Sequence, residues 1–400
     1  MRSIRKERLV SFMPILLPAR AFVFWPVGCG DSTTIKVNDN VFIQVDINHL
    51  ALADDEDEPF SPVVDRLMDL LPKEKGIRYL AVFALTHADQ DHCKDFKLLM
   101  EKVEAGELRI GELWFTPRVL RDYSEHEELS EDAQAFCDEA MRRVAVVCDQ
   151  GEDTDSGDRV RVIGSDDILD EDDFKGLPDR FKSRPGDEIT ILDGADLAGT
   201  FRAFLHAPFG DDSTGERNKT SLGMQVTLTD GDGAGRLMLL GDLDYPPLRR
   251  IFVEYSDNED TAWDVLLAPH HCSKSALYFK EEDDEEEVLK RDLVDAMTKA
   301  GGDMGWVVAS STAVPASNQD GDDPPHALAK AQYESIAPSG FLCTGDDEDS
   351  DDPIVFEVDE SGVSLFSGGQ SSGESKAAEA VKNARGGDAP HATQVGFGAG

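Results

Sequence analysis

Tyr79-Leu-Ala-Val-Phe-Ala-Leu-Thr-His87-Ala-Asp89-Gln-Asp91-His92 is the stretch that decides the fold. It begins with a continuous apolar run from Tyr79 to Leu85, which is typical of a β-strand buried on both faces of a sheet. Four side chains that can bind a metal then follow within six residues. A helix could not turn all four toward one point, whereas a tight loop can. The pattern therefore predicts a metal site at the mouth of a buried strand.

The segment from His87 to His92 is called the box below. Its residue types indicate which metals it suits. Because alternate residues of an extended loop point the same way, His87 and Asp89 can reach one ion, and Asp91 and His92 can turn to a second. Imidazole together with carboxylate suits zinc, manganese or iron rather than a soft thiolate metal. The alternative is a capped loop with chance acidic residues. The desolvation cost of clustered carboxylates favours the metal site, since a cation offsets that cost.

Outward from this stretch, short apolar runs alternate with helical segments, and Asn-, Asp- and Gly-rich turns separate them. This alternation predicts an α/β protein. Further strands are expected at residues 22–24, 41–45, 200–205, 222–228, 237–240, 265–268 and 306–309. Helices are expected after Ser61-Pro62, with Ser61 as the capping residue and Pro62 at the first position, over residues 130–147, and from Pro324-Pro325 to about Ile336. The acidic, Gly-rich segment 150–190 is interpreted as an insertion or lid.

Other histidines and an aspartate also follow predicted strands, where sites are commonly built on α/β scaffolds. Asp242 comes after a strand and a glycine, which suits a residue that bridges two ions, although Gly-Asp is also a common turn. His270 and His271 follow residues 265–268. One of the pair can ligate a metal while the other orients a substrate or donates a proton. A lone His206 after residues 200–205 is ambiguous.

Taken in order, the motifs of residues 20–360 resemble the metallo-β-lactamase fold, and more narrowly the branch typified by the hydrolase domain of the competence protein ComEC. The motifs are Val27-Gly-Cys-Gly-Asp-Ser32, Val45-Asp46, the box from His87 to His92, Leu205-His-Ala-Pro208, Asn218 with Ser221-Leu222, Gly241-Asp-Leu243, Pro269-His-His-Cys-Ser-Lys-Ser275, and Asn318 with His326. The chain departs from the branch pattern at Cys93-Lys94-Asp95, where two glycines are usual, at Cys272, where glycine is usual, and at the inverted Pro325-His326.

The resemblance implies an αββα sandwich of four layers over residues 21–366, with acidic loop insertions and two divalent metal ions, zinc or manganese. It implies that His87 and Asp89 hold one ion, with His206 as a candidate third ligand. Asp91, His92 and His270 would hold the other ion, and Asp242 would bridge. Asp91 or a neighbouring carboxylate would orient the attacking water. His271, Ser273, Lys274 and His326 are candidates for gripping a phosphate or protonating a leaving group.

Charge and composition bear on the substrate and on the chain ends. There are 81 Asp and Glu residues against 39 Lys and Arg, for a net charge of −42, which opposes nucleic-acid binding because that binding depends on basic residues that neutralise phosphates. The expected function is a phosphodiesterase or nuclease-like hydrolase. The alternatives are a hydrolase of a small ester, thioester or amide, and a non-catalytic interaction module that keeps the fold. Residues 1–20 are interpreted as an N-terminal extension and residues 367–400, which have almost no apolar anchors, as a disordered tail.

The six cysteines, at positions 29, 93, 137, 148, 272 and 343, form no CxxC pair. We interpret them as reduced thiols, which are typical of the cytoplasm. No apolar run approaches the roughly 20 residues that span a bilayer, so no membrane association is expected. Residues 2–21 imitate a secretory signal, but the apolar part is short and broken by Pro14, and cleavage after Ala21 would remove the start of a strand. A cytoplasmic location is therefore expected.

Overall fold

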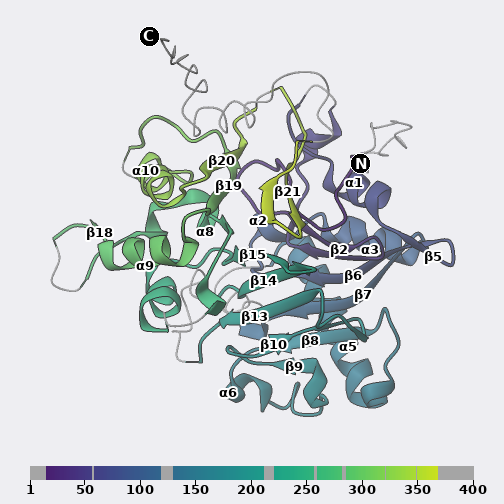
Figure 1. The fold of residues 1–400 in the computed structure, drawn as a ribbon. Helices are drawn as coiled ribbons and strands as arrows, with labels where there is room; N and C mark the ends of the chain where they lie inside the picture. The colour runs from purple at the N-terminus through teal and green to yellow at the C-terminus, as the bar shows by residue number, and fades with distance from the viewer. Residues whose placement is uncertain are drawn as a thin grey trace, which may run out of the picture.

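The computed structural model describes residues 15–55, 58–118, 129–210, 220–255, 259–281, 285–319, 321–347 and 349–367. The expected tail from residue 368 onward, residues 1–14 of the expected N-terminal extension, and Asn218 lie outside the described residues. Two β-sheets form the centre of the molecule, and helices lie outside them (Figure 1).

The first sheet carries the stretch that opened the sequence analysis. Its strands, in spatial order, are β22 (Gly362–Leu365), β21 (Ile354–Asp359), β1 (Ala21–Phe24), β2 (Thr33–Asn38), β3 (Val41–Val45), β6 (Ile77–Ala84), β7 (Leu108–Phe115), β8 (Arg159–Ile163) and β9 (Lys182–Ser183), with β5 (Lys73–Glu74) paired to β6. β3, β6, β7 and β8 run parallel. Parallel strands end at the same edge, so this edge collects the residues that follow them.

The second sheet carries the later motifs. Its strands, in spatial order, are β10 (Glu188–Ile189), β13 (Phe201–Ala207), β14 (Gly223–Asp230), β15 (Gly233–Leu239), β16 (Val265–Leu267), β19 (Trp306–Thr312) and β20 (Gly340–Gly345). β15, β16, β19 and β20 are parallel, so Asp242 and the pair His270-His271 follow neighbouring strands at one edge. Two small hairpins, β11–β12 (Ile191–Leu192, Ala195–Asp196) and β17–β18 (Tyr278–Phe279, Val288–Leu289), stand apart from both sheets.

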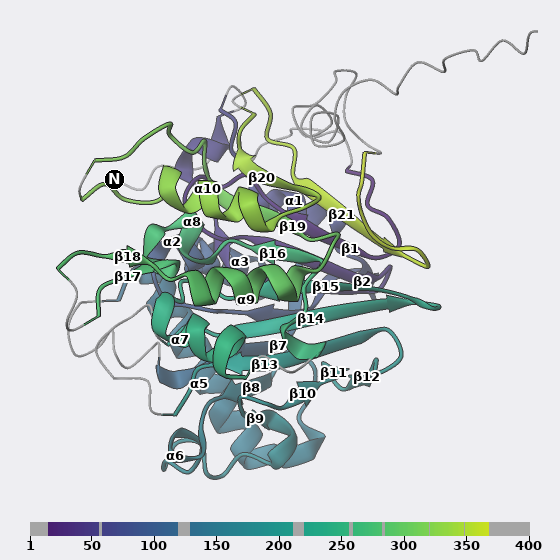
Figure 2. The same cartoon turned by 60° about the vertical axis from the view of Figure 1, so that its left-hand side comes forward.

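Three buried clusters show that the layers are helix, sheet, sheet and helix. Phe22, Val82 and Met224 belong to a cluster made by the facing sides of the two sheets. The opposite side of the first sheet packs on the helices α1 (Val63–Leu70), α3 (Phe96–Glu104) and α5 (Glu131–Gln150). The opposite side of the second sheet packs on α7 (Tyr245–Arg249), α9 (Arg291–Gly301) and α10 (Ala327–Ile336), which stand in front of it in Figure 2. The expected αββα sandwich is therefore confirmed.

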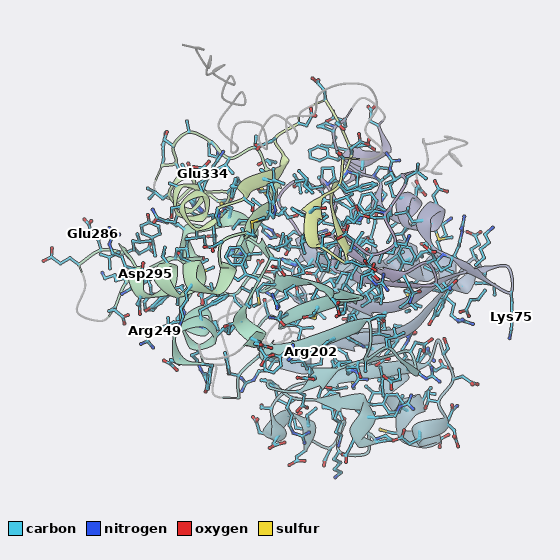
Figure 3. All side chains as sticks on the ribbon, viewed as in Figure 1. Lys75, Arg202, Arg249, Glu286, Asp295 and Glu334 are labelled. Atoms are coloured by element: carbon cyan, nitrogen blue, oxygen red, sulfur yellow. The ribbon has the colours of Figure 1, made fainter. Side chains whose placement is uncertain are left out.

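β6 is apolar from Tyr79 to Ala84 because this part of the strand is buried on both faces of the sheet. Leu80 and Phe83 face the helices, whereas Val82 and Ala84 face the other sheet. The charged side chains of Lys75, Glu286, Asp295 and Glu334 project from the periphery (Figure 3). No helix among the described residues is long and apolar enough to cross a membrane.

Two local expectations differ from the structure. The helix after Ser61-Pro62 begins at Val63 with Pro62 at its N-cap, and Ser61 does not cap it, because the Ser61 hydroxyl donates to the carbonyl of Asp351 instead. The acidic segment 150–190 is not only an insertion, because it supplies β8 and β9 to the first sheet. Burial of Val160 and Val162 explains that placement.

Candidate metal centre

The residues that follow β3, β6, β15 and β16 meet at one edge of the sandwich. The box after β6 is not a single loop. His87 and Asp89 lie in an extended segment, and the chain then forms the one-turn helix α2 (Gln90–Cys93), which carries Asp91 and His92. The bend at Asp89 therefore divides the box into two halves.

One carboxylate oxygen of Asp242 faces the second half of the box. Oδ1 of Asp242 is 3.0 Å from Nε2 of His92 and 3.4 Å from Nε2 of His271. Oδ2 of Asp91 is 3.2 Å from the same nitrogen of His271. One ligand atom from each of Asp91, His92, Asp242 and His271 lies within 4.8 Å of the others. These four side chains form the first group.

The other oxygen of Asp242 faces the first half of the box. Oδ2 of Asp242 is 4.0 Å from Nδ1 of His87 and 3.7 Å from Nε2 of His270. Nδ1 of His87 is 3.4 Å from Oδ2 of Asp89. His87, Asp89 and Asp242 meet the same 4.8 Å criterion. This is the second group, and Asp242 is common to both.

The side chain of His87 tests whether the groups fit a metal. It is 1% exposed, and neither ring nitrogen has a hydrogen-bond partner among the residues that the structure describes. An unsatisfied buried polar atom is costly and calls for an explanation. Ligand atoms about 2.1 Å from one ion lie roughly 3 to 4 Å apart, which matches the spacings around His87. Nitrogen and carboxylate oxygen donors together suit divalent metals such as zinc or manganese, so the residues present fit divalent metal binding.

Two further carboxylates stand behind the first group. Nδ1 of His92 is 2.8 Å from Oδ2 of Asp46, and the backbone amide of Thr86 donates to Oδ1 of Asp46 over 2.7 Å. Nδ1 of His271 is 3.3 Å from Oδ1 of Asp31. A carboxylate behind a ligating imidazole fixes its ring orientation and raises its basicity. Both imidazoles therefore turn their Nε2 atoms toward Asp242.

At four residues of the site the backbone adopts a left-handed conformation, which residues other than glycine rarely take. His270, His271 and Cys272 have φ values of 50°, 52° and 68°, and Asp46 has φ of 54°. Left-handed backbone costs about 1–2 kcal/mol per residue for L-amino acids. Strain of this kind gathers at functional sites, where the surroundings hold it in place.

The turn after β1, which contains Gly30 and Asp31, contacts the segment that carries Asp91. The amide of Asp31 donates to the carbonyl of Asp91 over 3.1 Å. Gly30 has φ of +149°, and a Cβ there would lie 2.7 Å from that same carbonyl oxygen and 2.1 Å from Nδ2 of Asn48. Only glycine allows so close an approach. The turn therefore positions Asp31 and the backbone of Asp91 together.

Charge at the centre is balanced between carboxylates and imidazoles. Burial opposes ionisation of Asp242, but the positive charges of His92 and His271 hold the pKa of this carboxyl well below its usual range. Burial is likewise outweighed at His92, where Asp242 and Asp46 raise the imidazole pKa well above its usual value. Burial lowers the pKa of His87 and leaves that ring neutral. Protons on the imidazoles thus carry positive charge that a bound cation would replace.

Three other sequence-predicted residues, Lys274, His326 and His206, have partners outside these two groups. Nζ of Lys274 pairs with Glu287 at 3.1 Å. Nδ1 of His326 accepts from the amide of Lys274 and Nε2 donates to the carbonyl of Asp322, at 3.2 and 3.1 Å. Both ring nitrogens of His326 are thus used by backbone. His206 donates from Nε2 to the carbonyl of Asp260 over 2.9 Å.

The structure therefore brings together six of the residues singled out from the sequence, namely His87, Asp89, Asp91, His92, Asp242 and His270. It adds His271, which was expected to act on the substrate, to the group of Asp91 and His92. Sequence reasoning did not assign roles to Asp31 and Asp46. Their positions in the sequence could have indicated a role, because Asp31 follows a glycine turn and Asp46 directly follows a strand.

Comparison with family models and curated proteins finds no match. Among solved structures, the chain is similar to the metallo-β-lactamase fold protein YhfI from Bacillus subtilis, with 14% identity over 84% of this chain and 99% of that chain and a TM-score of 0.41. It is similar to zinc-bound PqqB from Methylobacterium extorquens, with 10% identity, 84% and 99% coverage and a TM-score of 0.36. A diphosphatase of the PhnP family matches with 11% identity, 86% and 99% coverage and a TM-score of 0.34. At identities and scores this low, the activities of those proteins do not transfer to this chain.

Proposed function

We propose that the protein is a metal-dependent hydrolase with a dinuclear centre, and that it cleaves a small phosphodiester. The single observation that carries the proposal is the position of Asp242. Its two carboxylate oxygens face two separate groups of metal-binding side chains, His92 and His271 on one side and His87 on the other. A residue so placed can bridge two ions.

The two groups give the ligand sets. His87 and Asp89 would hold one ion, Asp91, His92 and His271 would hold the other, and Asp242 would serve both. When bound, two divalent ions supply Lewis acidity and stabilise both the attacking and the leaving oxygen of an in-line displacement. Zinc and manganese both suit this donor set.

Two side chains, those of Asp91 and Lys274, are candidates to act on the attacking water and on the substrate. Asp91 is the most exposed of its group, at 37% of its side chain. Although burial opposes it, contact with His271 lowers the pKa of Asp91 to about 2. The ionised carboxylate can accept a hydrogen bond from an attacking water and orient it. Lys274 follows Ser273 in the segment after the histidine pair, and its Nζ pairs with Glu287 at 3.1 Å. On leaving Glu287, this ammonium would offer its charge to a phosphate oxygen.

The charged groups near the centre and the net charge of the chain discriminate between the candidate substrates. Lys274 and the carboxylate-rich donor set favour a phosphate ester over an acyl ester, because hard oxygen donors and a cation suit phosphoryl chemistry. A net charge of −42 disfavours long nucleic acids, whose binding needs many phosphate-neutralising residues. A small diester carries one negative charge and avoids most of that repulsion. The proposed substrate is therefore a small phosphodiester rather than a nucleic-acid strand.

The test combines metal analysis with a choice of substrates. Metal-stripped protein is reconstituted with zinc or manganese, and about two equivalents are expected after dialysis. Hydrolysis of bis-p-nitrophenyl phosphate is then compared with hydrolysis of p-nitrophenyl acetate and of single-stranded DNA. Asp242→Asn should lose metal and activity together, whereas Asp39→Asn, on an exposed turn, should lose neither. Cleavage of the acetate alone would replace the phosphodiester by an acyl substrate, and failure to bind metal would leave the non-catalytic module.

A further inference from the structure

We propose that the adjacent histidines are divided between the two metal positions, so that His270 is the remaining ligand beside His87 and Asp89, and His206 anchors a loop instead. This inference rests on the proposed dinuclear centre. It departs from the ligand sets that the sequence suggested, in which His206 was the candidate for the first ion and His270 belonged with Asp91 and His92.

The first argument is the oxygen that each histidine faces. Nε2 of His270 is 3.7 Å from Oδ2 of Asp242, the oxygen that also lies 4.0 Å from His87. Nε2 of His271 is 3.4 Å from Oδ1 of Asp242. These separations exceed the 2.7–3.2 Å of a hydrogen bond, and they match the roughly 3 to 4 Å between ligands of one ion. Each histidine thus shares a different oxygen of Asp242 with a different half of the box.

The second argument is the left-handed backbone at His270 and His271, which lets these two adjacent side chains point in different directions. In the short segment α8 (Pro269–Cys272), His270 and His271 both lie in the left-handed region. Their rings are 6.0 Å apart between centroids, with planes at 80°. The amide of His270 donates to the carbonyl of Gly241 over 3.0 Å, which ties this turn to the loop that carries Asp242. The strained turn is therefore held in place next to Asp242, the residue that would bridge the two positions.

The third argument is what stands behind His270. Oγ of Ser275 is 3.4 Å from Nδ1 of His270. Nδ1 of His270 therefore faces the Ser275 hydroxyl while Nε2 faces Asp242, which is the usual relation between a ligating imidazole and its outer partner. Ser275 is thereby a positioning residue for His270, as Asp46 is for His92 and Asp31 for His271.

His206 has different surroundings. Its ring packs against Phe204, with centroids 4.9 Å apart, and its Nε2 donates to the carbonyl of Asp260. Burial lowers the pKa of His206 to about 4, and the charged groups that act on it are Asp260 and Arg202. Nε2 of His270, by contrast, lies 3.7 Å from Oδ2 of Asp242. His270 thus faces the centre, whereas His206 contacts the loop.

The loop that His206 holds has a structural task. Arg202, labelled in Figure 3, pairs with the carboxylate of Asp260. Nε2 of Gln225 donates to the carbonyls of Glu259 and Ala262, over 2.9 and 2.7 Å. Side chains from β13 and β14 therefore fix residues 259–262, which lead into β16 and on to the histidine pair. His206 contributes to that attachment.

The experiment uses full-length protein, stripped of metal and titrated with Co²⁺, and it reads bound metal by elemental analysis and visible absorption. Wild type should retain about two equivalents. His270→Gln should retain about one, as should His271→Gln, but with different absorption bands because different positions are emptied. His206→Gln, which keeps a donor for the Asp260 carbonyl, should retain about two equivalents with the wild-type spectrum.

Failure of the inference differs from failure of the proposed function. Loss of one equivalent in His206→Gln, with two retained in His270→Gln, would overturn the division of the histidines while leaving a dinuclear centre. A wild type that binds no Co²⁺ would overturn the proposed function itself. If His270→Gln does not fold, Ser275→Ala provides the test: metal affinity should fall about 10- to 100-fold, and unchanged affinity with an unchanged spectrum would contradict the role of His270.

Discussion

Oδ1 of Asp31 lies 3.3 Å from Nδ1 of His271, and the amide of Asp31 donates to the carbonyl of Asp91. Asp31 follows β1 in the first sheet, whereas His271 follows β16 in the second. One residue thus holds two members of the same metal-binding group, and it does so across the sandwich. The pairing makes Asp31 a positioning residue for the centre.

Replacing this carboxylate should weaken metal binding without unfolding the protein. In Asp31→Asn the amide contact to Asp91 remains, but the negative charge behind His271 is lost. Outer-shell changes of this type cost about 10- to 100-fold in metal affinity. Titration of the stripped protein with zinc against a competing chelator measures the change. Asp39→Asn serves as the control, and equal affinities for the two variants would show that Asp31 does not position His271.

The close approach at Gly30 should make that position intolerant of a side chain. In Gly30→Ala the new Cβ would lie 2.1 Å from Nδ2 of Asn48 and 2.7 Å from the carbonyl of Asp91. Overpacking of this type costs about 1–3 kcal/mol, with backbone strain in addition. Gly76→Ala is the control, because Gly76 also has positive φ but no atom of the described residues lies within 4 Å of a Cβ added there. Urea denaturation should give a clearly lower midpoint for Gly30→Ala, and matched midpoints would refute the packing argument.

Metal removal should lower the free energy of unfolding. Asp31, Asp46, Asp89, Asp91 and Asp242 gather at one edge of the sandwich, so a bound cation relieves their mutual repulsion. With free metal roughly a hundredfold above Kd, binding to the folded state alone adds about 2.7 kcal/mol. Thermal unfolding with and without zinc measures the shift. The shift should be nearly absent in Asp242→Asn, and a full shift in that variant would place the metal elsewhere.

A buried arginine on α5 should matter more than its exposed neighbour. Arg143 is 1% exposed, pairs with Glu139 at 2.7 Å, and donates to the carbonyl of Arg159 over 3.1 Å. Arg142 pairs with the same Glu139 but is 46% exposed. Breaking a buried pair costs about 3–5 kcal/mol, whereas a surface pair contributes about 0–1 kcal/mol. Urea denaturation of Arg143→Ala and Arg142→Ala should show this contrast with metal binding intact; similar losses would contradict it.

Local patterns were enough for much of the fold. The apolar run of β6 needs both faces buried, because it offers no polar face to water, and the box lies at its end by covalent connection alone. The same holds for Asp242 after β15 and for the histidine pair after β16. The sequence patterns therefore predicted the α/β class, several strands of both sheets and the strand ends at which the metal-binding side chains gather, while the four layers were implied by the resemblance.

Which side chains contact one another at the edge of the sandwich depends on the tertiary structure and could not be predicted from the sequence. Nothing local distinguishes His270 from His271, since the left-handed turn that separates them is held by a hydrogen bond to Gly241. His206 follows a strand just as His270 does, yet the carbonyl that it meets belongs to Asp260. These contacts join residues far apart in the chain, and their geometry depends on how the two sheets pack. The sequence by itself determined which side chains reach the edge of the sandwich; the packing of the sheets determined which of them face one another.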